Sequence, residues 1–319
     1  MWKIFVKRAL ILVPQLFALS VLVFFIGYLM PGDAFTGMIS PQDSPRRVAQ
    51  LRELHGLDHP WHVQYLRWVG NAARGDFGRS ITHRLPVTEI VAQRALNTAY
   101  LQMLTITLMY AIAIPLGIVA GRYNGRWPEK VISTYTYFML AMPTVVFGML
   151  VLFVFGFHLG WVPVRGSVDI GAAPGAEYFI SRLRHMLAPA LTGALMWTTH
   201  IVQYLRSEIV DFKAAEFVTT ARAKGVPERS IYTRHIFRNA LLPVAAGFGF
   251  MLVSMLTGSV FIETVFSYPG MGGLFLESVT LRDFSVINFL LLLFGVMLVV
   301  GSFVSDIAIS VADPRIRIR

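Results

Sequence analysis

Three histidines in the first quarter of the chain have a spacing that could serve a metal site. His55, His59 and His62 are separated by four and three residues, so a helix would present them on one face. Pro60 interrupts such a helix, and neither an acidic residue nor a cysteine completes a ligand set. Ordinary loop histidines are therefore favoured, and we expect no metal site in this chain.

Other residue patterns that would support catalysis do not occur in the sequence. The chain has 319 residues and no cysteine, which excludes disulfides, thiolate metal sites and cysteine nucleophiles. It contains no phosphate-binding loop of the form GxxxxGK(S/T), and no HExxH or Ser-His-Asp arrangement. We therefore expect no catalysis by this chain alone and no cofactor bound in it.

A few polar or adaptable side chains fall inside apolar stretches. Ionisable residues such as His200 are rare there and often functional, although a neutral imidazole bonded to a neighbouring helix is the favoured interpretation. Asp306 lies near the end of the last apolar stretch, where it can pair with a basic residue or reach the interface. Met139 and Met142 offer an adaptable lining for a pathway, but core or lipid contacts are favoured. The residues that line a pathway stay unassigned from sequence.

The composition indicates an integral membrane protein. Hydrophobic residues make up 55% of the chain and charged residues 14%, and the mean hydropathy is +0.60. A soluble protein of this length would carry roughly a quarter charged residues. The net charge of +10 does not indicate nucleic-acid binding, because the basic residues are divided among loops that flank apolar stretches.

Six stretches are long and apolar enough to cross a bilayer, which takes about 20 residues. They predict an all-α, polytopic membrane protein with a single transmembrane domain over residues 1–319. The first stretch is too long for a cleaved signal peptide, so we expect it to be retained as a helix. The predicted spans are residues 9–30, 99–121, 132–157, 186–205, 242–262 and 286–304.

The distribution of positive charge predicts that both termini are cytoplasmic. With that orientation, 16 of the 28 Lys and Arg residues lie inside, including all five lysines. An excess of Lys and Arg in cytoplasmic loops is the general rule for membrane proteins.

The segment 31–97 is expected to form a small helical cap outside the membrane. Trp61, Tyr65 and Trp68 recur at spacings of four and three, which places an aromatic stripe on one helical face. Packing at the membrane interface is favoured over ligand contact for this stripe. A later outer loop contains the glycine-rich turn SYPGMGG, from Ser267 to Gly273.

The segment 206–243 is the most polar and basic part of the C-terminal half, and it predicts two short helices with a sharp bend. Gly225 suits the left-handed position after a helix end, and Pro227 suits the first turn of the next helix. Pro243 marks the far boundary. Four alanines make the first helix slim enough to enter a groove on another protein: Ala214, Ala215, Ala221 and Ala223. An ordinary cytoplasmic loop is the alternative.

This loop resembles the coupling loop of ABC importer permeases, in which an alanine-rich helix and a glycine are followed by Leu-Pro. The matching residues are Ala221, Gly225, Leu242 and Pro243, whereas threonines occupy the positions where that family usually has glutamate and alanine. These departures fit the peptide and nickel branch. Its blocks match TARAKG at 220–225, RHIFRNALLP at 234–243, GLDHPWHVQYLRW at 56–68, GDFGRS at 75–80, ETVFSYPGMG at 263–272 and DPRIR at 313–317.

The resemblance implies a type I ABC importer permease fold with six transmembrane helices in a bacterial cytoplasmic membrane. It implies three kinds of protein partner in addition to the bilayer: a homologous second permease forming a heterodimer, two ATP-binding subunits that hold ATP and magnesium, and an extracytoplasmic peptide-binding protein. The residues expected to couple to the ATPases are Ala215, Glu216, Thr219, Thr220, Ala221, Arg222, Ala223, Lys224, Gly225, Val226, Pro227, Leu242 and Pro243.

The sequence therefore predicts a permease subunit that carries oligopeptides or dipeptides into the cell. Nickel and glutathione stay open as substrates, because a permease sequence does not reveal them. A self-contained channel or ion-driven carrier is the alternative of another class. It would need charged groups or broken helices facing a pore, and the apolar stretches carry almost no charge.

Overall fold

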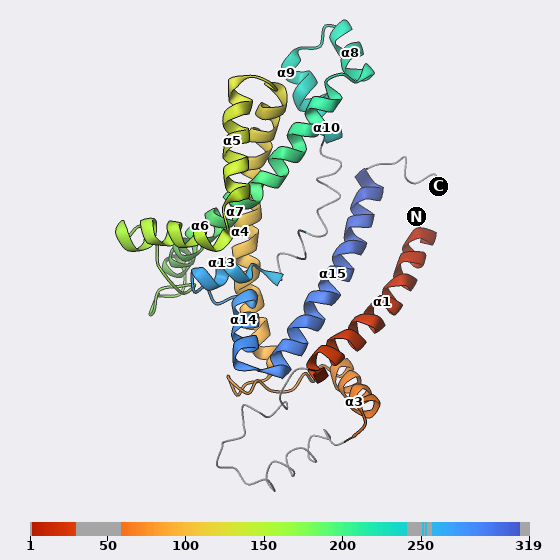
Figure 1. The fold of residues 1–319 in the computed structure, drawn as a ribbon, viewed down its shortest axis with the longest axis vertical. Coiled ribbons are helices and arrows are strands. Elements are labelled where there is room, and N and C mark those ends of the chain that lie inside the picture. Colours follow the sequence, from red (N-terminus) through yellow and green to blue (C-terminus); the bar gives the residue numbers. More distant parts are fainter. Residues whose placement is uncertain (1, 30–58, 241–250, 252, 254–256, 313–319) are drawn as a thin grey trace.

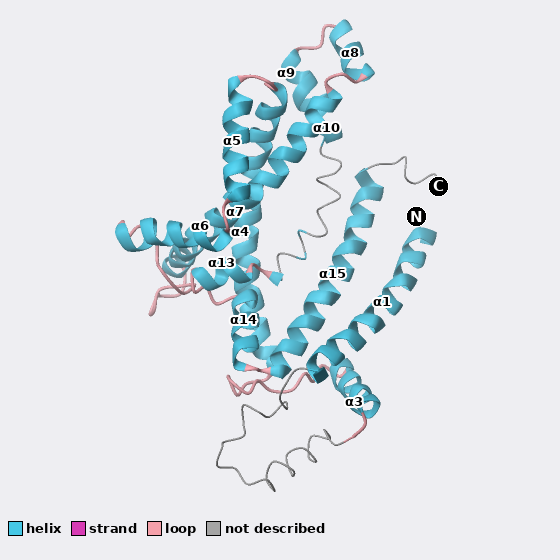
Figure 2. Cartoon of the chain, viewed as in Figure 1, coloured by secondary structure: helices cyan, strands magenta, loops and turns pink. Residues whose placement is uncertain are grey.

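The computed structural model describes residues 2–29, 59–240, 251, 253 and 257–312 (Figure 1). Within these ranges the regular elements are helical, with one isolated bridge between Arg79 and Pro86, which confirms the all-α class for this part of the chain (Figure 2). The helices are α1 (Trp2–Leu29), α3 (Trp61–Ala73), α4 (Val87–Arg122), α5 (Trp127–Ala141), α6 (Thr144–Val151), the π-helical η1 (Leu152–His158), α7 (Ala176–Phe212), α8 (Glu216–Ala223), α9 (Glu228–Ser230), the π-helical η2 (Ile231–Ile236), α10 (Phe237–Ala240), α13 (Val260–Val265), α14 (Met271–Leu281) and α15 (Phe284–Ala312).

The two longest helices, α4 and α7, pack along each other and form the centre of the molecule (Figure 1). Gly117 and Gly121 lie four residues apart on α4, where a Cβ would come within 2.8 Å of Leu205 and 2.7 Å of Ile209 on α7. Small residues at this spacing let two helix backbones approach closely. The pair therefore forms a tightly packed scaffold, in which larger side chains at the two glycines would force the helices apart.

Three of the predicted spans coincide with long apolar helices. Residues 10–29 of α1, the whole of α4, and residues 284–305 of α15 are long and apolar enough to cross a membrane. α4 begins at Val87, about three turns before the predicted span, so the predicted outer segment 31–97 overlaps its first turns. α1 and α15 lie side by side, apart from the α4–α7 scaffold over most of their length (Figure 1).

The predicted third span, residues 132–157, is not one continuous helix. α5 ends at Ala141, and the helix formed by α6 and η1 leaves at an angle of 104°. Met142 has extended dihedrals (φ −82°, ψ 122°), as expected for the residue before a proline, and Pro143 lacks the N–H that would continue the helix. Pro143 falls inside the predicted span, and the structure shows a break in the helix there.

The two remaining predicted spans have different outcomes. Residues 186–205 lie inside α7, a continuous helix of 37 residues that carries charged groups towards both ends. Residues 242–262 fall mainly on positions outside the described residues. The described part thus contains three helices apolar enough to span a membrane, or four if the bent pair counts as one span.

The aromatic stripe predicted on the outer segment packs against α1. α3 begins directly after Pro60, and its Tyr65 and Trp68 rings lie 5.4 and 6.2 Å from the Phe24 ring. The Tyr65 hydroxyl also forms a hydrogen bond of 2.8 Å with the Ser20 hydroxyl. The stripe therefore anchors α3 to the first helix. Of the three spaced histidines, His55 lies outside the described residues.

A buried carboxylate organises the glycine-rich turn between α13 and α14. Glu263 is 1% exposed, and it accepts hydrogen bonds from the Thr98 hydroxyl of α4 (2.8 Å) and from the Gly273 N–H (3.0 Å). The Met271 N–H in turn donates to the Thr98 hydroxyl oxygen (2.7 Å). A Cβ on Gly272 would lie 2.7 Å from the backbone nitrogen of Val260. The turn is thus held in place by the Glu263 side chain and by Thr98 of α4.

Candidate functional site

The predicted coupling loop begins where α7 ends. The last α7 turn closes with Lys213 N–H bonded to the Ile209 carbonyl (3.1 Å), after which Ala215 adopts an extended conformation. α8 then starts with Glu216 in its first turn, where a carboxylate interacts favourably with the positive end of the helix dipole. Figure 1 shows α8, α9 and α10 together at one end of the molecule, with α8 extending beyond the end of α5.

The bend between α8 and the next helix is a Schellman motif centred on Gly225. The Val226 N–H bonds to the Ala221 carbonyl (3.1 Å), and the Gly225 N–H bonds to the Arg222 carbonyl (2.9 Å). Gly225 has φ +72°, as the sequence predicted for the residue after a helix end. Pro227 caps α9 from the position just before the helix, one residue earlier than predicted. We name residues 224–227 the elbow.

One face of α8 is buried against the protein itself. Val218 and Ala221, three residues apart, pack with Ile231 and Ile236 of η2 and with Leu205 of α7. Val226 packs against the same cluster, which supplies the apolar contact that usually accompanies a Schellman motif. The sequence predicted that Ala221 helps to make this helix slim enough to enter a groove on another protein, but its side chain is buried within this chain. The alanine is needed for the close contact within this chain.

The other face of α8 and the elbow point into solvent. Ala215 and Val226 are half-buried, and Leu242 and Pro243 lie outside the described residues. The exposed residues of the predicted coupling set are Glu216, Thr219, Thr220, Arg222, Ala223, Lys224, Gly225 and Pro227. We call these eight residues the outer face of the loop.

An ion pair spans the elbow. Arg222 Nε lies 2.7 Å from Glu228 Oε1, and this hydrogen bond joins the last turn of α8 to the first turn of α9. The bond from Arg222 holds the pKa of the Glu228 carboxyl below its ordinary value, and the pair raises the pKa of Arg222. Both side chains are exposed, so the pair contributes little to stability and mainly restrains the angle between the helices.

Two further contacts brace the loop on the scaffold. Lys213 Nζ donates to the Arg122 carbonyl at the end of α4 (2.8 Å), and the Arg122 guanidinium lies over the Tyr232 ring of η2 at 5.3 Å. Burial and the neighbouring Arg222 lower the pKa of Lys213. These contacts join η2, α4 and the end of α7.

The turn between α4 and α5 is tied to α7 in the same region. Arg206 Nε lies 2.9 Å from Glu129 Oε1, and Arg206 also donates to the Asn124 side chain (3.2 Å). Ser133 donates to the same Glu129 oxygen (2.7 Å). This end of the molecule is therefore one cross-linked unit of α4, α5, α7 and the loop.

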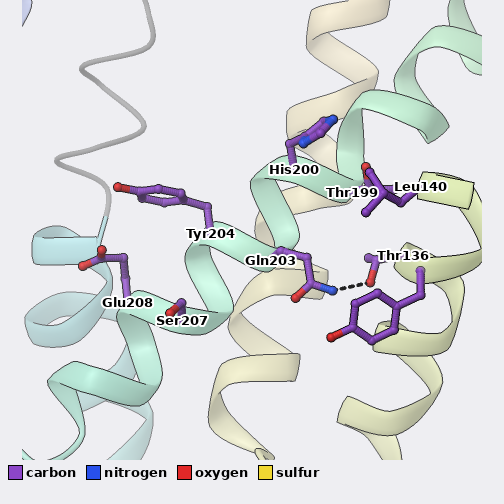
Figure 3. Close-up of a pocket in the computed structure, with 9 residues that line it drawn as sticks. Thr136, Leu140, Thr199, His200, Gln203, Tyr204, Ser207 and Glu208 are labelled. Carbon is purple, nitrogen blue, oxygen red and sulfur yellow. Dashed lines mark hydrogen bonds between the residues drawn. The ribbon is translucent and has the colours of Figure 1, made fainter.

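An open groove runs between α5 and α7 (Figure 3). Its volume is about 430 Å³, and Gln203 Nε2 donates to the Thr136 hydroxyl across it (2.6 Å). A second cavity of about 260 Å³ shares Leu140, Thr199 and His200 with it and continues towards Met139, Met142 and Met196. The residues lining the larger cavity are Thr136, Tyr137, Leu140, Thr199, His200, Gln203, Tyr204, Ser207 and Glu208.

His200 has a different environment from the one expected. Its side chain is exposed in the groove, and its ring lies 5.8 Å from the Trp197 ring of the same helix, rather than bonding to a neighbouring helix. The sequence flagged His200, and favoured a solvated helix face over an ATPase contact for Glu208, but it missed Tyr204 and Ser207. Tyr204 and Ser207 lie four and seven residues after His200, which places them on one helical face with it, and this spacing was the signal available.

Comparison with known proteins identifies the family. The model for the binding-protein-dependent transport system inner membrane component matches residues 113–318, and a model for the N-terminal part of such components matches residues 1–101. The chain belongs to this family. Its members are ABC transporter permease components, membrane subunits without catalytic activity of their own.

Curated relatives cover almost the whole permease. The oligopeptide transport system permease protein AppB of Bacillus subtilis (strain 168) is 36% identical over 313 residues, which are 98% of each chain. The glutathione transport system permease protein GsiC of Salmonella typhimurium (strain LT2) is 33% identical over 311 residues, 98% of this chain and 97% of the relative. GsiC of Escherichia coli (strain K12) is 32% identical over 312 residues, 98% of each. The predicted resemblance to ABC importer permeases is confirmed.

Proposed function

We propose that this permease carries short peptides into the cell and that its 206–243 loop receives the motion of two ATP-binding subunits. The observation that carries the second part is the geometry of the loop. α8 packs against the protein through Val218 and Ala221 and is closed by the Schellman motif, while Thr219, Ala223 and Lys224 on its outer face are exposed. Such an element is suited to press on another protein and transmit force.

The proposed assembly contains a second, homologous permease with a type I fold of six helices, two ATPases that bind ATP and magnesium, and an external peptide-binding protein. With both termini in the cytoplasm, the basic loop lies on the ATPase side, in keeping with the excess of Lys and Arg there. ATP-driven closure of the ATPases would move the two permeases' loops together. The braces at Arg122 and Arg206 would pass this movement to α4, α5 and α7.

The relatives favour a peptide substrate. The names of the compared permeases specify oligopeptides and glutathione, and glutathione is itself a small peptide. A self-contained channel is disfavoured by the family. Nickel, which stayed open from sequence, has no support from these relatives.

The test is uptake into liposomes that contain this permease, its sister permease, both ATPases and the binding protein. Labelled di- to pentapeptides, glutathione and nickel would each be offered with and without ATP in the compartment of the ATPases. We expect ATP-dependent accumulation of peptides. Accumulation of nickel alone would keep the architecture and change the substrate, whereas equal peptide flux without ATP would contradict the importer.

A further inference from the structure

One face of α7 is too polar for contact with lipid. Trp197, His200, Tyr204 and Ser207 follow one another at spacings of three and four and are exposed, and Glu208 lies beside them. An imidazole at the lipid surface of a membrane protein is costly, and Glu208 lies just beyond the end of the predicted fourth span, so this face is turned to water or to another protein. The opposite face of the same helix packs against Gly117 and Gly121 of α4.

Two side chains on this face present groups that attract a cation. Tyr204 and Glu208 are one helical turn apart, which separates their Cβ atoms by about 6 Å, and both project to the same side of α7 (Figure 3). Tyr204 is 46% exposed and its ring face is accessible. Among the described residues, no basic side chain forms an ion pair with Glu208. An ammonium group can contact the carboxylate and the aromatic ring together.

We propose that Glu208 and Tyr204 bind the protonated amino terminus of the transported peptide. The proposal rests on the peptide-import function and adds a recognition site within this subunit. The α-amino group of a peptide has a pKa of about 7.7–8.0, so it is largely a cation at neutral pH. Across the groove, a hydrogen bond between Gln203 of α7 and Thr136 of α5 fixes the floor beside this pair.

The adjoining cavity suits the side chains that follow the amino terminus. Met139, Met142 and Met196 line it, and thioether side chains adapt to ligands of different shape. The two cavities meet at His200, about 12 Å along α7 from Glu208 at 1.5 Å per residue. The charged amino terminus, which all such peptides share, would bind at Glu208, and side chains of different kinds would lie in the apolar cavity beyond His200. Such a site would accept many peptides but require a free amine.

The direct test is equilibrium dialysis with the purified transporter in the absence of the binding protein, which removes any preference of the delivering protein. The probes are a radiolabelled alanine tripeptide and its N-acetylated form. Wild-type transporter is expected to bind the free amine about tenfold more tightly, the magnitude of one charge-assisted hydrogen bond. Glu208→Gln should abolish this preference, and Tyr204→Leu should reduce it.

The matched control is Glu177→Gln, which neutralises an exposed acid in the first turn of the same helix, far from the groove. It should keep the preference for the free amine. The proposal is overturned if wild type shows no preference or no binding, or if Glu208→Gln keeps the preference. Those results would leave Glu208 as a contact for the sister permease.

Uptake by the complete system separates this proposal from the proposed function. If wild type accumulates peptides with ATP but dialysis shows no role for Glu208, only the amine site is wrong. If wild type accumulates no peptide, the peptide-import function itself fails, whatever the dialysis shows.

Discussion

The two glycine-rich turns of this permease need glycine for different reasons. At the elbow, Gly225 has φ +72° and nothing lies within 4 Å of the position a Cβ would take, so only the backbone conformation requires glycine. At the turn between α13 and α14, Gly272 has no room for a Cβ, which would lie 2.7 Å from a backbone nitrogen. The first turn is open to solvent, whereas the second is filled by the Glu263 carboxylate.

The elbow is proposed to contact a partner protein, whereas the turn between α13 and α14 is held in place by contacts within this chain. The elbow is shaped by hydrogen bonds within its own backbone and leaves its outer side free for contact. The other turn depends on Glu263 and Thr98, which join α13, α14 and α4. Substitutions at the two turns should therefore fail in different ways, one in folding and the other in coupling.

The largest effect is expected at the internal turn. Gly272→Val would place side-chain atoms against the Val260 backbone, which cannot yield without opening the turn, and overpacking of this kind costs about 1–3 kcal/mol or more. We expect loss of monodisperse protein in size-exclusion chromatography after detergent extraction. Gly273→Ala is the control, because its Cβ would find no atom closer than 3.6 Å. Well-folded Gly272→Val would contradict the steric account.

At the elbow, the expected effect is on coupling with little effect on folding. Gly225→Val places a β-branched residue at φ +72°, a conformation that costs a non-glycine residue roughly 1–2 kcal/mol, so the angle between α8 and α9 should change. ATP hydrolysis should continue while ATP-dependent uptake falls severalfold, measured on the same liposomes. Gly225→Asn should keep both activities, because asparagine tolerates the left-handed region. Unchanged coupling in Gly225→Val would count against the loop assignment.

The smallest effect is expected from the ion pair across the elbow. The pKa of Glu228 is held below its ordinary value by Arg222, so the pair's stabilisation is present above the unfolded-state pKa, about 4.3, and is lost as pH falls through the lowered folded-state value. Hydrogen exchange of the Val226 amide should therefore be faster, after correction for intrinsic rates, in acid than at neutral pH. Glu228→Gln should remove this difference. An unchanged pH dependence in Glu228→Gln would show that the pair does not restrain the elbow.

Sequence reasoning succeeded where local rules decide the structure. Gly225 marked the helix end because only a left-handed residue completes the Schellman motif, and the long apolar helices α1, α4 and α15 followed from composition. It failed where packing decides. The inward position of Ala221, the packing of Gly117 and Gly121 on Leu205 and Ile209, and the sharpness of the break at Pro143 depend on neighbours distant in sequence.

The groove is a second feature that the sequence alone could not predict. His200 stood out because a polar residue in an apolar stretch is unusual. Tyr204 and Glu208 become candidates for a binding site only once the structure shows that the opposite face of α7 packs on α4. The direction of a helix face cannot be read from one sequence. It took the structure to show which residues of α7 share the open side with His200 (Figure 3).

The most direct test of the central claim uses the absence of cysteine from this chain. Single cysteines would be placed at Thr220 or Ala223 on the outer face of the loop, and at Ala221 on its inner face, with a cysteine scan of the ATPase surface as partner. Disulfide cross-linking of the assembled transporter should join Thr220→Cys and Ala223→Cys to the ATPase and leave Ala221→Cys unlinked. Cross-links from Ala221→Cys alone, or from none of the three, would contradict docking through this face.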